Sequence, residues 1–122
     1  MTDFDLTLEE PILASVLDIL NKSKIEDLAL YNVGKRSIVA EWFVIATCIS
    51  GRQIDALSDE IRLISKDEKR RTIEGDGETG WLLFDLGNVV VHLFTKQQRE
   101  YYNLDEYWID TEVKTGLAVE KE

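Results

Sequence analysis

The chain has 122 residues, of which 44% are hydrophobic, so it can bury one sizeable core and a single domain is expected. Its 24 acidic residues outnumber its 14 basic residues and give a formal net charge of −10. This balance disfavours the clustered cationic surface that binds nucleic-acid phosphates; it either serves solubility alone or suits a basic protein partner.

The N-terminal part of the chain predicts a helix followed by a strand. Thr7-Leu8-Glu9-Glu10 matches a capping box, in which Thr7 caps the helix and Glu10 reaches back, and Pro11 is tolerated in the first helical turn. A strand is expected at Leu28–Val33. Before that strand, apolar residues recur at helical spacing up to about Ser23, namely Ile12, Leu13, Val16, Leu17 and Leu20.

The sequence lacks the features of a membrane span or a leader peptide. No apolar run approaches the length that crosses a bilayer, and the N-terminal residues are too acidic for a signal or transit peptide. The single cysteine, Cys48, cannot form a disulfide within the chain and is expected to be a buried, unreactive thiol. These features predict a cytoplasmic protein with no membrane partner.

The middle of the chain predicts a strand, a helix and a second strand. Glu41–Cys48 is dense in apolar residues, as in a central strand covered on both faces. Ser50-Gly51-Arg52-Gln53 is a second capping box that opens a helix, and Arg70–Glu74 can form a short strand. The segment Gly75–Gly80 lacks the lysine of a phosphate-binding loop and precedes a strand, so we expect a turn there. The inner stripe of the helix comprises Ile54, Leu57, Ile61 and Ile64.

Residues 80–94 predict a β-hairpin with two different faces. Gly87-Asn88 suits the positive φ angles of a tight turn, and pairing outward from it sets Asp85 opposite Val90. A slip of one residue would carry Asp85 to the apolar face, so the register is well specified. The apolar face carries Leu82, Phe84, Leu86, Val89, Val91 and Leu93. The other face carries Trp81, Leu83, Asp85, Val90, His92 and Phe94.

The C-terminal part predicts a short helix and then a tail. Thr95-Lys96-Gln97-Gln98 is a third capping box, which starts a helix through Tyr102. Residues 111–122 show no apolar periodicity, so we expect a domain at 1–110 and an acidic, disordered tail at 111–122. The order of elements predicts a single α/β domain with one mixed sheet of about five strands flanked by helices.

Several linked motifs resemble the ribosomal silencing factor family, also called Iojap or RsfS. The resemblance covers roughly Ser15 to Asp110. Its residues are Ala40–Ile45, Arg52-Gln53, Trp81, Leu83, Asp85, Gly87–His92, Arg99, Glu100, Tyr102, Leu104 and Trp108. The chain departs from the family pattern at Glu41, Trp42, Cys48-Ile49 and Asn88. The resemblance implies a core similar to that of nucleotidyltransferases.

The residues predict no catalytic, metal or cofactor site. Transfer of a nucleotide needs a phosphate grip and two or three convergent carboxylates, whereas Asp85 is the only carboxylate in the hairpin strands. Asp3 and Asp5 have suitable spacing but lie in an N-terminal segment. His92 is the only histidine, and with Cys48 on another strand it falls short of a zinc site. An Asp85–His92 hydrogen bond with a structural role is expected.

The family resemblance implies a function without bond chemistry. It implies binding to ribosomal protein L-fourteen on the large subunit, a steric block to joining of the small subunit, and hence repression of translation. The expected docking residues are Trp81, Leu83, Asp85, Leu86, Asn88 and Val90, with His92 in support. For Trp81, a role in the core and a role as an apolar anchor are about equally favoured.

Two other kinds of function stay open from the sequence. One is a nucleotidyltransferase-like, metal-dependent enzyme, and the other is an adaptor that self-associates through a sheet edge. A homodimer could also form away from the ribosome. No sequence-specific nucleic-acid partner is expected.

Overall fold

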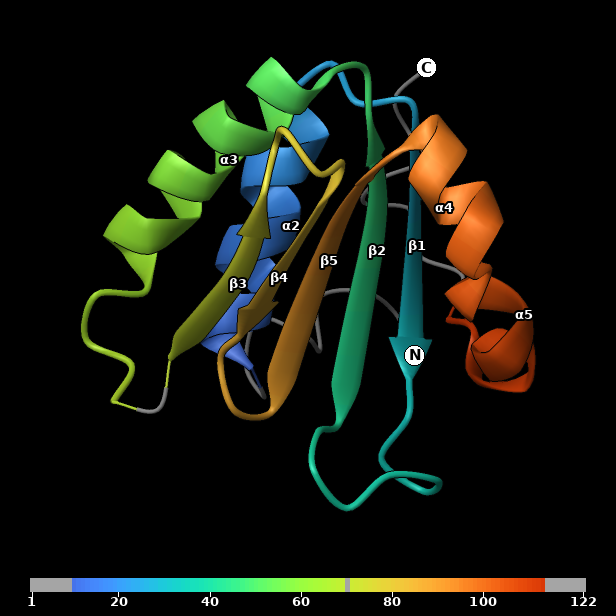
Figure 1. Cartoon of the computed structure of the whole chain (residues 1–122). Helices are drawn as coiled ribbons and strands as arrows, with labels where there is room; N and C mark the ends of the chain where they lie inside the picture. The colour runs from blue at the N-terminus through green and yellow to red at the C-terminus, as the bar shows by residue number, and fades with distance from the viewer. Residues whose placement is uncertain (1–9, 70, 114–122) are drawn as a thin grey trace.

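Five strands form one mixed sheet in the order β1-β2-β5-β4-β3 (Figure 1). The structure is a computed structural model that describes residues 10–69 and 71–113. Its strands are β1 (Asp27–Asn32), β2 (Trp42–Cys48), β3 (Thr72–Asp76), β4 (Trp81–Asp85) and β5 (Val89–Thr95). Only β2 and β5 pair in parallel, and the other neighbouring strands of this sheet are antiparallel. The expected α/β fold with a mixed five-stranded sheet is confirmed.

Helices cover the two faces of the sheet unequally. The longer helices α2 (Pro11–Lys22) and α3 (Gly51–Ile64) lie on one face, and the short helices α4 (Lys96–Tyr102) and α5 (Leu104–Trp108) lie on the other (Figure 1). A 3-10 turn, η1 (Ile109–Thr111), follows α5. Because side chains alternate along each strand, the sheet supplies apolar residues to both layers.

Capping side chains start two of the helices as expected. The Ser50 hydroxyl accepts a hydrogen bond from the Gln53 N–H at 3.1 Å, and the Thr95 hydroxyl accepts one from the Gln98 N–H at 3.5 Å. The first capping box is wrong in its placement. Glu10 is itself the N-cap of α2 and makes no side-chain cap, while Thr7 lies outside the described residues. Proline at the first helical position explains the later start, because its fixed φ suits a helix and its missing N–H needs no partner.

The hairpin register matches the sequence prediction. Asp85 pairs with Val90, and the Leu86 N–H donates to the Val89 carbonyl at 2.8 Å. Of the two turn residues, only Gly87 takes a positive φ, at 91°, so Asn88 does not share the left-handed conformation expected of the pair. Glycine in the first central position is the preference of a type II′ turn.

The main core lies between the sheet and the helices α2 and α3. The apolar face of the hairpin is buried there as predicted, and so is Cys48, whose thiol pKa is raised by burial to about 12. Ile64 corrects the predicted stripe, because it is 38% exposed while Ser65 is buried. The next inward position after Ile61 falls four residues on, at Ser65, where the hydroxyl donates to the Ile61 carbonyl.

The fold extends beyond the predicted domain boundary at residue 110. Glu112 forms a β-bridge with Tyr31, and the Val113 N–H donates to the Leu30 carbonyl at 2.8 Å. Residues 111–113 therefore cover part of the outer edge of β1 and are not part of a disordered tail; the rest of that prediction, 114–122, lies outside the described residues. Within the ranges described, none of the helices could cross a bilayer.

Truncating Phe84 to alanine should destabilise the fold strongly, because its side chain is fully buried against α2 and α3. We expect Phe84→Ala to lower the free energy of unfolding by about 3–5 kcal/mol in urea denaturation. Leu63, on α3, is 70% exposed, so Leu63→Ala is the matched control and should change stability by less than about 0.5 kcal/mol. Equal losses in the two variants would show that the core is wrongly located.

Candidate docking site

The sheet face opposite α2 and α3 is open over β3 and β4. Trp81, Leu83 and Asp85 alternate along β4 on this face and are each half-buried, and Asn88 is exposed at the hairpin turn. The aromatic cover from α4 reaches the edge of this region, where the Tyr102 ring lies 4.4 Å from the Trp81 ring. We call the surface formed by Trp81, Leu83 and Asp85 with the facing residues of β3 the open face.

Three of the residues expected to dock lie beneath the surface. Leu86 is 4% exposed and belongs to the core beside α2 and α3, because it alternates with Phe84. Val90 and His92 are 8% and 5% exposed. This burial disfavours direct contact by Leu86 and Val90, and it is compatible with the supporting place expected of His92. The other predicted docking residues, Trp81, Leu83, Asp85 and Asn88, reach the surface.

Strand β3 adds carboxylates that the sequence reasoning missed. Its register sets Glu74 opposite Leu83 and Asp76 opposite Trp81, and directly opposed residues share a face of the sheet. Both carboxylate residues are exposed on the outermost strand. The open face therefore combines an apolar row on β4 with an acidic row on β3. Extending the pairing across the Gly77–Gly80 turn could have predicted this arrangement.

A hollow of about 250 Å³ lies where β3 and β4 meet α4. Its lining is aromatic and polar, and comprises Glu74, Gly75, Thr79, Trp81, Leu83, Gln98 and Tyr102. Two aromatic rings beside a carboxylate attract a cationic side chain, because the faces of the rings carry a negative electrostatic potential and the carboxylate a negative charge. This hollow can accept a lysine or arginine side chain.

Trp81 is held from below by an aromatic cluster and one hydrogen bond. Its indole N–H donates to Nδ1 of His92 at 3.2 Å, and its ring stacks on Phe94 with centroids 5.0 Å apart. The expected Asp85–His92 hydrogen bond is absent from the described residues, and Oδ1 of Asp85 accepts the Gly87 N–H at 3.0 Å instead. Both Trp81 and Asp85 are diagonal neighbours of His92, roughly 7–8 Å away along the strands, and only the longer indole spans that distance.

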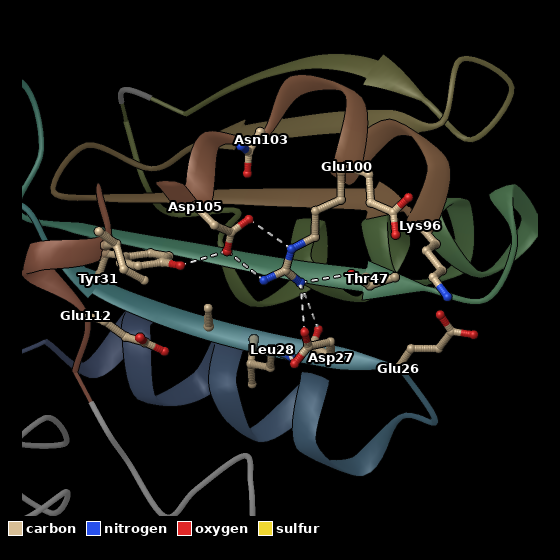
Figure 2. Close-up of a pocket in the computed structure, with 13 residues that line it drawn as sticks. Glu26, Asp27, Leu28, Tyr31, Thr47, Lys96, Glu100, Asn103, Asp105 and Glu112 are labelled. Carbon is tan, nitrogen blue, oxygen red and sulfur yellow. Dashed lines mark hydrogen bonds and ion pairs between the residues drawn. The ribbon is translucent and has the colours of Figure 1, made fainter. Parts of the chain in front are cut away.

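A larger hollow, of about 610 Å³, lies between β1 and the helices α4 and α5 (Figure 2). At its centre the Arg99 guanidinium donates to both oxygens of Asp105, at 3.0 and 2.7 Å, and to the Thr47 hydroxyl at 2.8 Å. The Tyr31 hydroxyl also donates to Asp105, at 2.7 Å.

These contacts pair the charges of Arg99 and Asp105 at the centre of this larger hollow. Burial alone would raise the pKa of the Asp105 carboxyl, but hydrogen bonds from Arg99 and Tyr31 outweigh burial and hold that pKa below its ordinary value. The cluster connects α4 and α5 to β1 and β2, so its hydrogen bonds stabilise the packing of these helices on the sheet.

The described residues contain no group of three or more His, Cys, Asp or Glu side chains placed to hold a metal ion. Asp3 and Asp5, whose spacing drew attention in the sequence, lie outside the described ranges. The open face itself combines apolar side chains on β4 with carboxylates on β3, an arrangement suited to contact with another protein surface.

Comparison with known proteins points to one family. The family model described as "Ribosomal silencing factor during starvation" matches residues 7–122. Ribosomal silencing factor RsfS of Bacillus subtilis is 34% identical over 104 residues, which span 84% of this chain and 88% of that protein. The mouse protein named "Mitochondrial assembly of ribosomal large subunit protein 1" is 28% identical over 98 residues, 76% of this chain and 43% of that protein. A crystal structure of a protein from Bacillus halodurans is similar with a TM-score of 0.72 and 29% identity, covering 86% of this chain and 98% of that one.

The buried His92 should make stability depend on pH. Burial lowers its pKa from 6.5 to about 4, so between these values the unfolded chain binds a proton that the folded chain does not. The contribution of the neutral His92 to the free energy of unfolding is fully present above pH 6.5. It is lost as the pH falls towards 4, which lowers the free energy of unfolding by roughly 3 kcal/mol. Urea unfolding at pH 7 and pH 4 should therefore show a smaller loss for His92→Asn than for the wild type, and equal losses would contradict a buried neutral imidazole.

Proposed function

The chain belongs to the ribosomal silencing factor family, and we propose that it binds ribosomal protein L-fourteen on the large subunit and blocks joining of the small subunit. The observation that carries the proposal is the open face, on which Trp81 and Leu83 adjoin the carboxylates of Glu74 and Asp85. Apolar anchors beside acidic side chains are complementary to a basic protein surface.

Charge favours a ribosomal protein over ribosomal RNA as the direct contact. The net charge of −10 repels phosphate, whereas a basic protein within the ribosome attracts it. The name of the mouse relative refers to the large ribosomal subunit, and it supports the choice of that subunit. Repression then needs no reaction, because a domain bound where the subunits meet excludes the small subunit by its volume.

The open face has the character of a binding hot spot. Tryptophan is enriched at such spots, and Trp81 is supported by Phe94 and Tyr102. The adjoining hollow, with Glu74 in its lining, is suited to a lysine or arginine side chain of the partner. Asp85 uses Oδ1 for the Gly87 N–H, and its charge remains available to attract a cation at the end of the apolar row.

The enzyme reading is less favoured. A nucleotidyltransferase-like enzyme would need convergent carboxylates for metal, and the described part of the chain offers no such group. Fold similarity does not by itself carry an activity. Self-association is compatible with the main proposal if a homodimer forms through the same open face away from the ribosome, since the dimer and the ribosome would then compete.

Reversing charges on the open face should weaken binding to the large subunit. We expect Glu74→Lys and Asp85→Lys to reduce affinity by about tenfold or more each, mainly through slower association, while the protein stays folded. Asp59→Lys is the matched control, since Asp59 is exposed on α3 and the change in net charge is the same. Sucrose-gradient co-sedimentation with purified subunits and a subunit-joining assay measure the effect.

Two outcomes of that experiment would contradict the docking face. Equal weakening by all three variants would indicate a general charge effect, and normal binding by both variants of the open face would locate the contact elsewhere. Binding of the wild type to small subunits as strongly as to large subunits would contradict the proposed partner.

We also expect no nucleotide chemistry. Calorimetric titration with ATP, CTP and GTP in the presence of magnesium should show no saturable heat, because the described residues hold no carboxylate cluster that could bind a metal–nucleotide complex. Tight nucleotide binding that Asp85→Ala abolishes would favour the enzyme reading.

A further inference from the structure

We propose that His92 is a positioning residue, which fixes the Trp81 indole in the orientation that borders the hollow without touching the partner itself. This inference rests on the proposed function, because it assigns a residue that prepares the docking face. It concerns a side chain that is 5% exposed and therefore cannot supply contact area.

Most contacts of Trp81 do not fix its rotation. The centroid of its ring lies 5.0 Å from that of Phe94, with an angle of 24° between the ring planes. The corresponding values for Tyr102 are 4.4 Å and 45°. Such ring–ring contacts hold the indole between two surfaces but tolerate sliding and turning. The hydrogen bond from the indole N–H to Nδ1 of His92 is directional, so it sets where the edge of the ring points.

His92 is itself held firmly enough to act as a reference. It lies on β5, between β2 and β4, with the Phe43 ring at 5.2 Å in an edge contact. The centroid of the Phe94 ring lies 6.0 Å from that of the imidazole, and the two ring planes are nearly parallel, with an angle of 6° between them. An imidazole fixed by rings on a central strand can transmit its position to the indole.

The unpaired nitrogen of His92 points to a role beyond folding. Because Nδ1 accepts the indole hydrogen, the neutral ring carries its own proton on Nε2, and the described residues offer Nε2 no hydrogen-bond partner. Burying a lone N–H costs free energy that an apolar side chain of similar size would not cost. The contribution that only a histidine makes here is therefore the acceptor Nδ1 for the Trp81 indole. Burial lowers the imidazole pKa to about 4, which keeps Nδ1 free to accept at neutral pH.

Substitutions at His92 and Trp81 separate the roles of the imidazole. His92→Phe removes the acceptor and keeps a ring, while His92→Asn places an amide oxygen near the position of Nδ1. Trp81→Phe removes the donor. His92→Leu replaces His92→Phe should the larger ring prevent folding.

The first measurement needs no partner. In a ¹H–¹⁵N spectrum of the full chain, the Trp81 indole N–H is identified by its loss in Trp81→Phe, and its hydrogen exchange is followed at pH 7. We expect exchange at least tenfold faster in His92→Phe at unchanged or higher resistance to urea, with protection restored in His92→Asn. Unchanged exchange in both His92→Phe and His92→Leu overturns the proposal.

The second measurement is affinity for purified large subunits. We expect His92→Phe to bind at least threefold more weakly, His92→Asn to recover most of this loss, and His92→Phe to have no further effect in a Trp81→Phe background. Faster exchange without weaker binding overturns the positioning role. If Glu74→Lys and Asp85→Lys are nevertheless impaired, the proposed docking face stands and only the role of His92 fails. If those variants also bind normally, the proposed function fails with it.

Discussion

The hydrogen bond from the Leu86 N–H to the Val89 carbonyl, closed around Gly87, fixes how β4 lies against β5. Alternate residues of the hairpin then enter the core beside α2 and α3, and the residues between them point to the opposite face of the sheet. A shift of one residue would bring Asp85 into the core and Phe84 out of it, which is energetically prohibitive. The separation of the buried core face of the hairpin from the open face follows from this register.

The open face, which we propose as the docking surface, exists because the second helical layer is incomplete. The ion pair of Arg99 with Asp105, joined by Tyr31 and Thr47, holds α4 and α5 over the β1 and β2 side of the sheet (Figure 2). The cover reaches only as far as Trp81, so the remainder of β4 and the outer strand β3 stay open. The Arg99–Asp105 cluster and the open face are thus two consequences of where these short helices end.

Local sequence signals predicted the parts of the fold that depend on neighbouring residues. The alternation of apolar and polar residues and a turn glycine predicted the hairpin register. The capping residues Ser50 and Thr95 predicted where two helices begin. Contacts between distant segments were not predictable in this way. The pairing of Val113 with Leu30 is one such contact, and the choice of Trp81 over Asp85 as the partner of His92 depends on side-chain reach across strands. The place of Glu74 on the open face was not predicted, because that prediction needs the pairing of β3 with β4 across the turn. The family was apparent from linked sequence motifs and not from physical reasoning.

Site-specific photocrosslinking tests the central claim most directly. A photoreactive benzoylphenylalanine replaces Leu83 on the open face or, as a control, Asp59 on α3, and each protein is irradiated with purified large subunits. The account predicts a crosslink from position 83 to one basic ribosomal protein, identified by mass spectrometry as L-fourteen, and none from position 59. Crosslinks from position 59 but not from 83, or crosslinks from 83 to ribosomal RNA alone, would contradict it.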